Sequence, residues 1–156
     1  MAHVSTFKDL CARLLREGTR VRFTAYGRSM YPTMRDKDII TVEPVLPSEV
    51  RRGDITLYRL NTSMIAHHVL KVTRPRSSSA RITIGPDTWG RPTETIGADK
   101  VLGRVIQVER GGVKLDPYSP RATLRLKIHK LASHLKRLLH IKVPSFSADK
   151  SRPSRP

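Results

Sequence analysis

Acidic residues, cysteines and long apolar runs are all scarce in this sequence, and each shortage excludes a class of protein. The single cysteine, Cys11, rules out an intrachain disulfide and fits a reducing compartment. No run approaches the roughly 18 apolar residues of a membrane-spanning helix, and residues 1–9 lack the apolar core of a secretory signal. Thirteen acidic residues against 30 Lys and Arg give a formal net charge of +17, which predicts attraction to anionic surfaces.

The 156 residues suit one domain of modest core followed by a tail. Composition and turn residues divide them into four parts. We expect an N-terminal helix in residues 1–18, a β domain in residues 19–110, a linker and basic helix in residues 111–143, and a disordered tail in residues 144–156. The predicted fold class is therefore mainly β with two flanking helices.

Residues 5–17 have the apolar spacing of a short helix that packs on the β domain. Ser5 can cap this helix and Gly18 can end it. Its apolar face consists of Phe7, Leu10, Cys11, Leu14 and Leu15. A DNA-reading helix-turn-helix would need a second helix, but the chain alternates as a strand from Thr19 onward.

Four later segments contain polar residues next to predicted strands. In the first, Ser29 lies in a turn between strands at residues 19–26 and 38–43, where Gly27 relaxes the backbone. The second has a Gly-Asp pair, Gly53-Asp54, before a strand, and Asp54 is expected to accept nearby backbone N–H groups. The third carries His67 and His68 on a strand at residues 64–72. Because neighbouring strand residues face opposite ways, at most one of them should reach Ser29.

The fourth segment is a strand followed by Gly85-Pro86-Asp87. The order of the four segments resembles that of type I signal peptidases and the self-cleaving LexA-type repressors, and the resemblance covers roughly residues 20–110. It implies a signal peptidase/LexA-like β-ribbon peptidase fold and a serine endopeptidase that needs no cofactor. Classical signal peptidases have a transmembrane anchor, so a member without one is expected in the cytoplasm or at the inner face of the membrane.

The resemblance also suggests a role for each matching residue. Ser29 falls at the nucleophile, and His67 at the histidine that archaeal and endoplasmic-reticulum members use as general base, with His68 where they have arginine. An imidazole can take a serine proton near neutral pH. Asp87 is the first candidate to orient His67, followed by Asp99 and then Glu94.

Two departures from the family pattern leave other functions open. A proline separates Gly85 from Asp87, and Gly27 stands where some signal peptidases have a second serine that supports the oxyanion. One alternative is a catalytically inactive module that binds peptides on the same fold. The other is a LexA-type regulator that cleaves itself, which would need a DNA-reading domain and a scissile loop ahead of Ser29.

The C-terminal residues 121–142 have leucines at helical spacing and many basic residues between them. The segment 121–156 contains ten Lys and Arg and a single acid, Asp149. The first interpretation is a helix packed on the domain or a partner with a solvated basic face, and the second is a helix in the plane of an anionic membrane. Nucleic acid is not favoured, because aromatic residues are not interleaved with the basic ones. No metal site is expected, since His129 and His134 are five residues apart rather than four.

Overall fold

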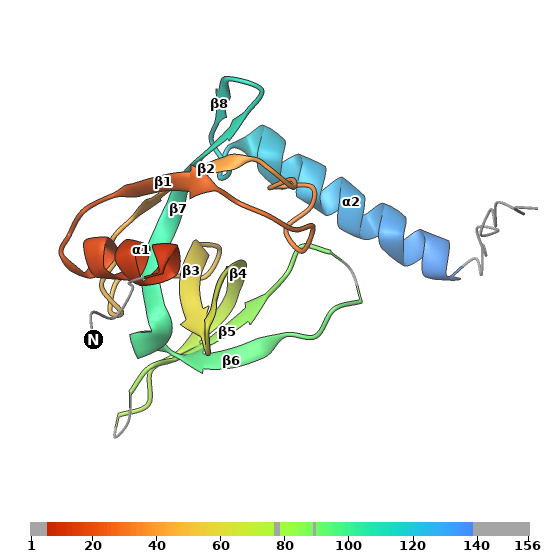
Figure 1. Cartoon of the computed structure of the whole chain (residues 1–156). Coiled ribbons are helices and arrows are strands. Elements are labelled where there is room, and N and C mark those ends of the chain that lie inside the picture. The colour runs from red at the N-terminus through yellow and green to blue at the C-terminus, as the bar shows by residue number, and fades with distance from the viewer. Residues whose placement is uncertain (1–5, 77–78, 89, 139–156) are drawn as a thin grey trace, which may run out of the picture.

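An antiparallel sheet that curls on itself carries most of the chain in the computed structural model, which describes residues 6–76, 79–88 and 90–138 (Figure 1). Its strands are β1 (Val21–Thr24), β2 (Ile39–Glu43), β3 (Ile55–Leu60), β4 (Ser63–Thr73), β5 (Arg81–Gly85), β6 (Glu94–Gly97), β7 (Val101–Arg110) and β8 (Val113–Leu115). The strand order is β1-β2-β7-β3-β4-β5-β6, and β8 pairs with β7. The expected mainly β class is confirmed.

The N-terminal helix α1 (Phe7–Arg16) begins with a capping box. The side chain of Thr6 accepts from the backbone N–H of Asp9, and Asp9 accepts from the N–H of Thr6. The cap is therefore Thr6 and not Ser5, which lies outside the described residues. Gly18 follows the helix at φ +85°, a conformation that favours glycine, and so ends it as expected.

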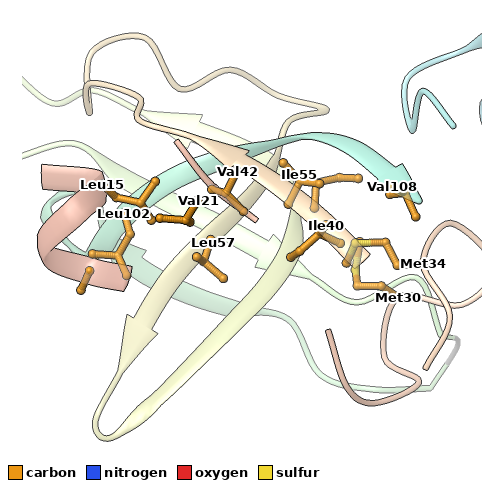
Figure 2. Packing of buried hydrophobic residues seen from close by; sticks show 12 residues of the cluster. Leu15, Val21, Met30, Met34, Ile40, Val42, Ile55, Leu57, Leu102 and Val108 are labelled. Carbon is orange, nitrogen blue, oxygen red and sulfur yellow. The ribbon is translucent and has the colours of Figure 1, made fainter. Parts of the chain in front are cut away.

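Two apolar clusters form the core, and β3 contributes to both because successive side chains face opposite sides of the strand. Ile55 and Leu57 belong to the first cluster and Tyr58 to the second. In the first cluster, Leu15 and Leu102 lie at one end and Met30 and Met34 at the other (Figure 2). Since Met30 and Met34 lie in the turn that carries Ser29, this packing anchors the turn to the sheet.

The long strand β7 joins the two halves of the sheet. Its residues pair with β2 on one side and with β3 on the other. At Gly103 a Cβ atom would lie 2.5 Å from the carbonyl oxygen of Glu43, so this crossing of strands requires a residue without a side chain. The close crossing brings the segment after β1 near β3 and β4.

The C-terminal helix α2 (Pro120–Leu138) follows the sheet. Pro120 occupies the first turn, where its missing N–H costs nothing. The helix extends away from the strands, so that its C-terminal end lies beyond the sheet (Figure 1). Residues 139–142 of the predicted helix and the predicted tail lie outside the described residues. Within the described ranges, no helix is long and apolar enough to cross a membrane.

The first interpretation of α2, a helix packed on the domain or on a partner, is wrong in one part, because its apolar face does not pack on the domain. Packing on a partner remains a prediction. The regularly spaced apolar side chains are between 47% and 63% exposed: Leu124, Ile128, Leu131, Leu135 and Leu138. The domain instead contacts the opposite side of the helix, which carries Ala122, Leu126 and His129.

Candidate active site

The turn that carries Ser29 is held in place by two aspartates that follow it. Asp36 accepts from the N–H of Gly27 at 2.8 Å. Buried Asp38 accepts from the N–H of Arg35 at 2.7 Å and from two nitrogens of Arg110, at 2.6 Å and 3.0 Å. This bidentate ion pair fastens the end of the turn to β7. The acidic residues after Ser29 therefore shape the backbone around it.

Gly27, two residues before Ser29, has a backbone conformation that disfavours a side chain. It adopts φ +108°, in a region that residues with side chains rarely enter. A hydroxyl at this position would therefore require a strained backbone.

Ser29 and His67 meet although 38 positions separate them in the sequence. The Nε2 atom of His67 lies 3.3 Å from the Oγ atom of Ser29, a separation that suits a nucleophile and its base in a site without substrate. His68, the next residue of β4, faces the other way. The expectation that at most one of the two histidines reaches Ser29 is thus confirmed.

Tyr58 occupies the far side of His67. Its hydroxyl lies 3.1 Å from the Nδ1 atom of His67, and the two rings are tilted at 5.9 Å between centroids. Burial raises the pKa of Tyr58 above its usual range, and the nearby carboxylate of Glu94 raises it further. A neutral phenol can accept from Nδ1–H, and this tautomer leaves Nε2 free to accept from Ser29.

The pKa of His67 is lowered from its ordinary value. Burial is the main cause, because it penalises the charged imidazolium, and neighbouring His68 contributes in the same direction. The carboxylates of Glu94 and Asp87 act against this and raise it. His67 is therefore a neutral imidazole at neutral pH, which is the form that a general base requires.

The expected hydrogen bond between Asp87 and His67 is replaced by another. Asp87 is 1% exposed, and its Oδ1 atom lies 2.7 Å from Nδ1 of His68. The reason is the path of the chain after β5, since Gly85 pairs with His68 in the β4–β5 ladder and Asp87 follows on that side. The second candidate, Asp99, lies in the short helix η1 (Ala98–Lys100), is mostly exposed and pairs with Lys100.

The segment after β5 also holds the backbone of Ser29. The N–H of Thr88 donates to the carbonyl oxygen of Ser29 at 3.0 Å, and the hydroxyl of Thr88 donates to that of Arg28 at 2.7 Å. Thr88 thus contacts the backbone of the nucleophile, while the carboxylate of the preceding Asp87 contacts His68. Trp89, which follows, lies outside the described residues.

An apolar cleft of about 480 Å³ opens beside Ser29. It lies between the β1 edge and the first half of β4, and its lining includes Phe23, Met30, Leu57, Met64 and Ala66. In the described ladder, β4 pairs with β5 only from His68 onward, so residues 63–67 pair with β3 alone. Two strand edges therefore border the cleft.

Asp54 confirms the structural role expected for it, because its carboxylate accepts from the N–H of Arg51 at 2.9 Å. Across the described ranges, no group of three or more His, Cys, Asp or Glu side chains could hold a metal ion.

No protein-family model matches this chain, and no curated protein does so either. The geometry of Ser29, His67 and the cleft is therefore the basis for a proposed function.

Tyr58 is the residue that the sequence did not suggest, although the sequence holds a usable signal. Asn61 and Thr62 form a two-residue turn between β3 and β4, with Leu60 opposite Ser63. Counting back along this hairpin sets Thr56 opposite His67 and makes Tyr58 its diagonal neighbour on the same face.

Proposed function

We propose that this protein is a serine endopeptidase with a signal peptidase/LexA-like fold. The observation that carries the proposal is the 3.3 Å approach of Ser29 Oγ and His67 Nε2 beside an apolar cleft. Short serine motifs recur by chance, but the convergence of a hydroxyl, a neutral imidazole and a cleft supports a common role.

In the proposed reaction, Ser29 Oγ attacks the scissile carbonyl carbon while His67 Nε2 takes its proton. The backbone N–H of Ser29 helps to stabilise the oxyanion. His67 then gives the proton to the leaving amine, and an acyl-enzyme ester on Ser29 remains. Water, deprotonated by His67, hydrolyses the ester and restores the free serine.

Tyr58 takes the orienting position that aspartate holds in the family pattern. The His67 Nδ1–H donates to the phenol oxygen, and this fixes the tautomer that keeps Nε2 as an acceptor. The carboxylate of Glu94 near Tyr58 favours the imidazolium that forms during the reaction, because its negative charge raises the pKa of His67. Asp87 instead holds His68, the neighbour of His67 on β4, and Thr88 holds the Ser29 turn.

The cleft would hold an extended peptide with apolar side chains. A segment entering between β1 and residues 63–67 of β4 can add to exposed strand edges by backbone hydrogen bonds. Its side chains would alternate between the apolar floor, which includes Leu57 and Met30, and solvent. This arrangement supports an unfolded or extended substrate segment.

The test is a fluorophosphonate probe, which labels activated serines, together with a panel of apolar peptides analysed by mass spectrometry. Wild type is expected to be labelled and to cleave at least one peptide, and Ser29→Ala to lose both properties. Ser63→Ala, a serine on the exposed start of β4, is the matched control and should behave as wild type. Equal labelling of wild type and Ser29→Ala would reject Ser29 as nucleophile.

A second candidate is a module that binds peptides in the same cleft without cutting them. The pairing of Asp87 with His68 favours it, since His67 then lacks a direct carboxylate partner. Peptide binding that persists in both Ser29→Ala and His67→Ala, with no product from wild type, would support this candidate. A self-cleaving regulator is testable by the intact mass after long incubation.

A further inference from the structure

A stripe of five apolar side chains runs along the outer side of α2. We call Leu124, Ile128, Leu131, Leu135 and Leu138 the leucine stripe; all five are between 47% and 63% exposed. Their spacing of four and three residues keeps them within one narrow sector of the helix. At 1.5 Å per residue the stripe is about 21 Å long.

The domain contacts the opposite side of α2. Ala122 and Leu126 face a hollow beneath the helix that Asp54 and His68 also line. The ring of His129 meets the ring of Tyr31 edge-on, with centroids 5.1 Å apart. These residues lie roughly half a turn from the stripe. The domain therefore fixes which way α2 faces and leaves the leucine stripe outward.

Basic residues border the stripe on both sides. Arg121 and Arg125 lie along one border and Lys127 along the other, while Lys130, Lys136 and Arg137 lie farther round the helix, towards its domain side. Pro120–Leu138 contains no Asp or Glu. The outward side of α2 is thus an apolar centre between two positive margins.

These charges argue against two occupants of the stripe. The 4-3 spacing would suit a coiled coil with a second copy, but the flanking positions of both helices would then bring basic residues together. The segment that follows α2, residues 139–156, is also a poor partner, because it carries four Lys and Arg against one acid. An anionic partner is required.

We propose that the leucine stripe binds the surface of an anionic lipid bilayer, with α2 lying in the plane of the membrane. A bilayer offers a flat apolar layer edged by negative phosphates, which matches an apolar centre with positive margins on both sides. Long basic side chains can reach the headgroups while the leucines enter the acyl boundary. This inference is independent of the proposed peptidase activity.

The test is co-sedimentation of the full chain with vesicles of phosphatidylcholine alone or with about one third phosphatidylglycerol. We expect binding to the anionic vesicles to be at least about tenfold tighter than to the neutral ones and to weaken at high salt. Leu131→Ser combined with Leu135→Ser should weaken anionic binding by at least about tenfold. The matched control is Leu46→Ser, because Leu46 is 62% exposed and Leu131 is 61% exposed.

A charge variant tests the margins separately and does not alter the stripe. Arg125→Gln with Lys127→Gln should weaken anionic binding about tenfold, whereas Lys71→Gln with Lys114→Gln, which removes two exposed charges elsewhere, should weaken it less. Ser29→Ala should bind as wild type does, so a failure of the peptidase proposal and a failure of membrane binding are distinguishable.

Three outcomes would overturn the proposal. Wild type would not bind anionic vesicles, or it would bind neutral and anionic vesicles equally well, or the stripe variant would bind anionic vesicles as well as Leu46→Ser does. Light scattering that finds a wild-type dimer, and a monomer for the stripe variant, would assign the stripe to a second copy instead. Vesicle binding that is lost only in the charge variant would also reject the stripe as the inserting element.

Discussion

At the scale of single residues, the protonation of His67 controls what Ser29 can do. Burial lowers the pKa of His67 from its ordinary 6.5, so the neutral base predominates near pH 7. We expect kcat/KM for a cleaved peptide to fall as the pH drops through this lowered pKa, with an acid-limb midpoint below 6.5. A pH–rate profile measures the midpoint. A midpoint above 6.5 would mean that another group is the base.

The same shift affects stability in the same direction. Below pH 6.5 the unfolded chain binds a proton at His67 that the folded chain resists, so His67 makes folding less favourable as the pH falls. Activity and stability should therefore both decline on the acid side, and folding must be followed separately by circular dichroism.

The phenol of Tyr58 gives a sharper residue-scale prediction. Tyr58→Phe removes the acceptor for His67 Nδ1–H and frees the imidazole to adopt the unproductive tautomer. We expect kcat to fall by about tenfold or more, with KM little changed because Tyr58 does not line the cleft. Steady-state kinetics on one peptide separate the two constants.

Tyr118→Phe is the control for this variant. Tyr118 also uses its hydroxyl inside the protein, donating to the carbonyl oxygen of Val105 and accepting from the N–H of Ile55, and these hydrogen bonds involve neither Ser29 nor His67. Burial raises its pKa to about 12, so it too is a neutral phenol. A fall in kcat of similar size in both variants would indicate general destabilisation and not orientation of His67.

At the scale of elements, the segment after β5 positions the nucleophile. Thr88→Val keeps the shape of the side chain but removes the hydroxyl that donates to Arg28, while the backbone bond to Ser29 remains. We expect the free energy of unfolding to fall by about 1 kcal/mol and kcat/KM to fall several-fold, because the Ser29 turn loses one of the two hydrogen bonds that it receives from Thr88. Denaturant titration and kinetics test this.

Thr83→Val, on the neighbouring strand β5, serves as its control. Thr83 and Thr95 share a weaker hydrogen bond of 3.4 Å across β5 and β6, away from Ser29. Activity should persist in this variant. If Thr88→Val also keeps full activity, the loop does not position Ser29.

The elements differ in how far the sequence could predict them. Alternation predicted β1, apolar segments next to turn residues predicted β2, β3, β4 and β5, and apolar spacing predicted α1 and α2. The short strands β6 and β8 offered too few residues for a period to emerge. The sequence did not distinguish whether the apolar face of α2 meets the domain, a partner or a membrane, because an apolar stripe looks the same in all three cases.

Only the pairing of Ser29 with His67 in the candidate site could be predicted from the sequence. Ser29 and His67 could be paired from the order of their segments, and the opposite orientation of His68 follows from the pleat of β4. The partner of Asp87 could not be predicted, because it depends on the path of the two residues after β5 and on the register of β4 with β5. A shift of one residue in that register would have presented Asp87 to the other face.

At the scale of the whole molecule, positive charge dominates, and an acidic side chain forms ion pairs that link neighbouring strands. Glu43 on β2 accepts from Arg104 of β7 at 2.8 Å and from Arg20 at 3.2 Å. The hydrogen bond from Arg104 is the main cause that holds the pKa of Glu43 below its ordinary 4.5. Protonating Glu43 therefore weakens the join between β2 and β7, the strand that links both halves of the sheet.

The ion pair between Glu43 and Arg104 predicts how the stability of the fold changes at acidic pH. A lowered folded pKa means that Glu43 contributes its full stabilisation above pH 4.5 and loses it as the pH falls through the folded value. Glu43→Gln should lower the free energy of unfolding at pH 7 and should make its decline between neutral pH and about pH 3 shallower than in wild type. Denaturant titrations across that range measure the slope, and Glu17→Gln on an exposed helix end should leave it unchanged. Parallel slopes for wild type and Glu43→Gln would show that other carboxylates control acid unfolding, since a group absent from the variant cannot contribute to a decline that both proteins share.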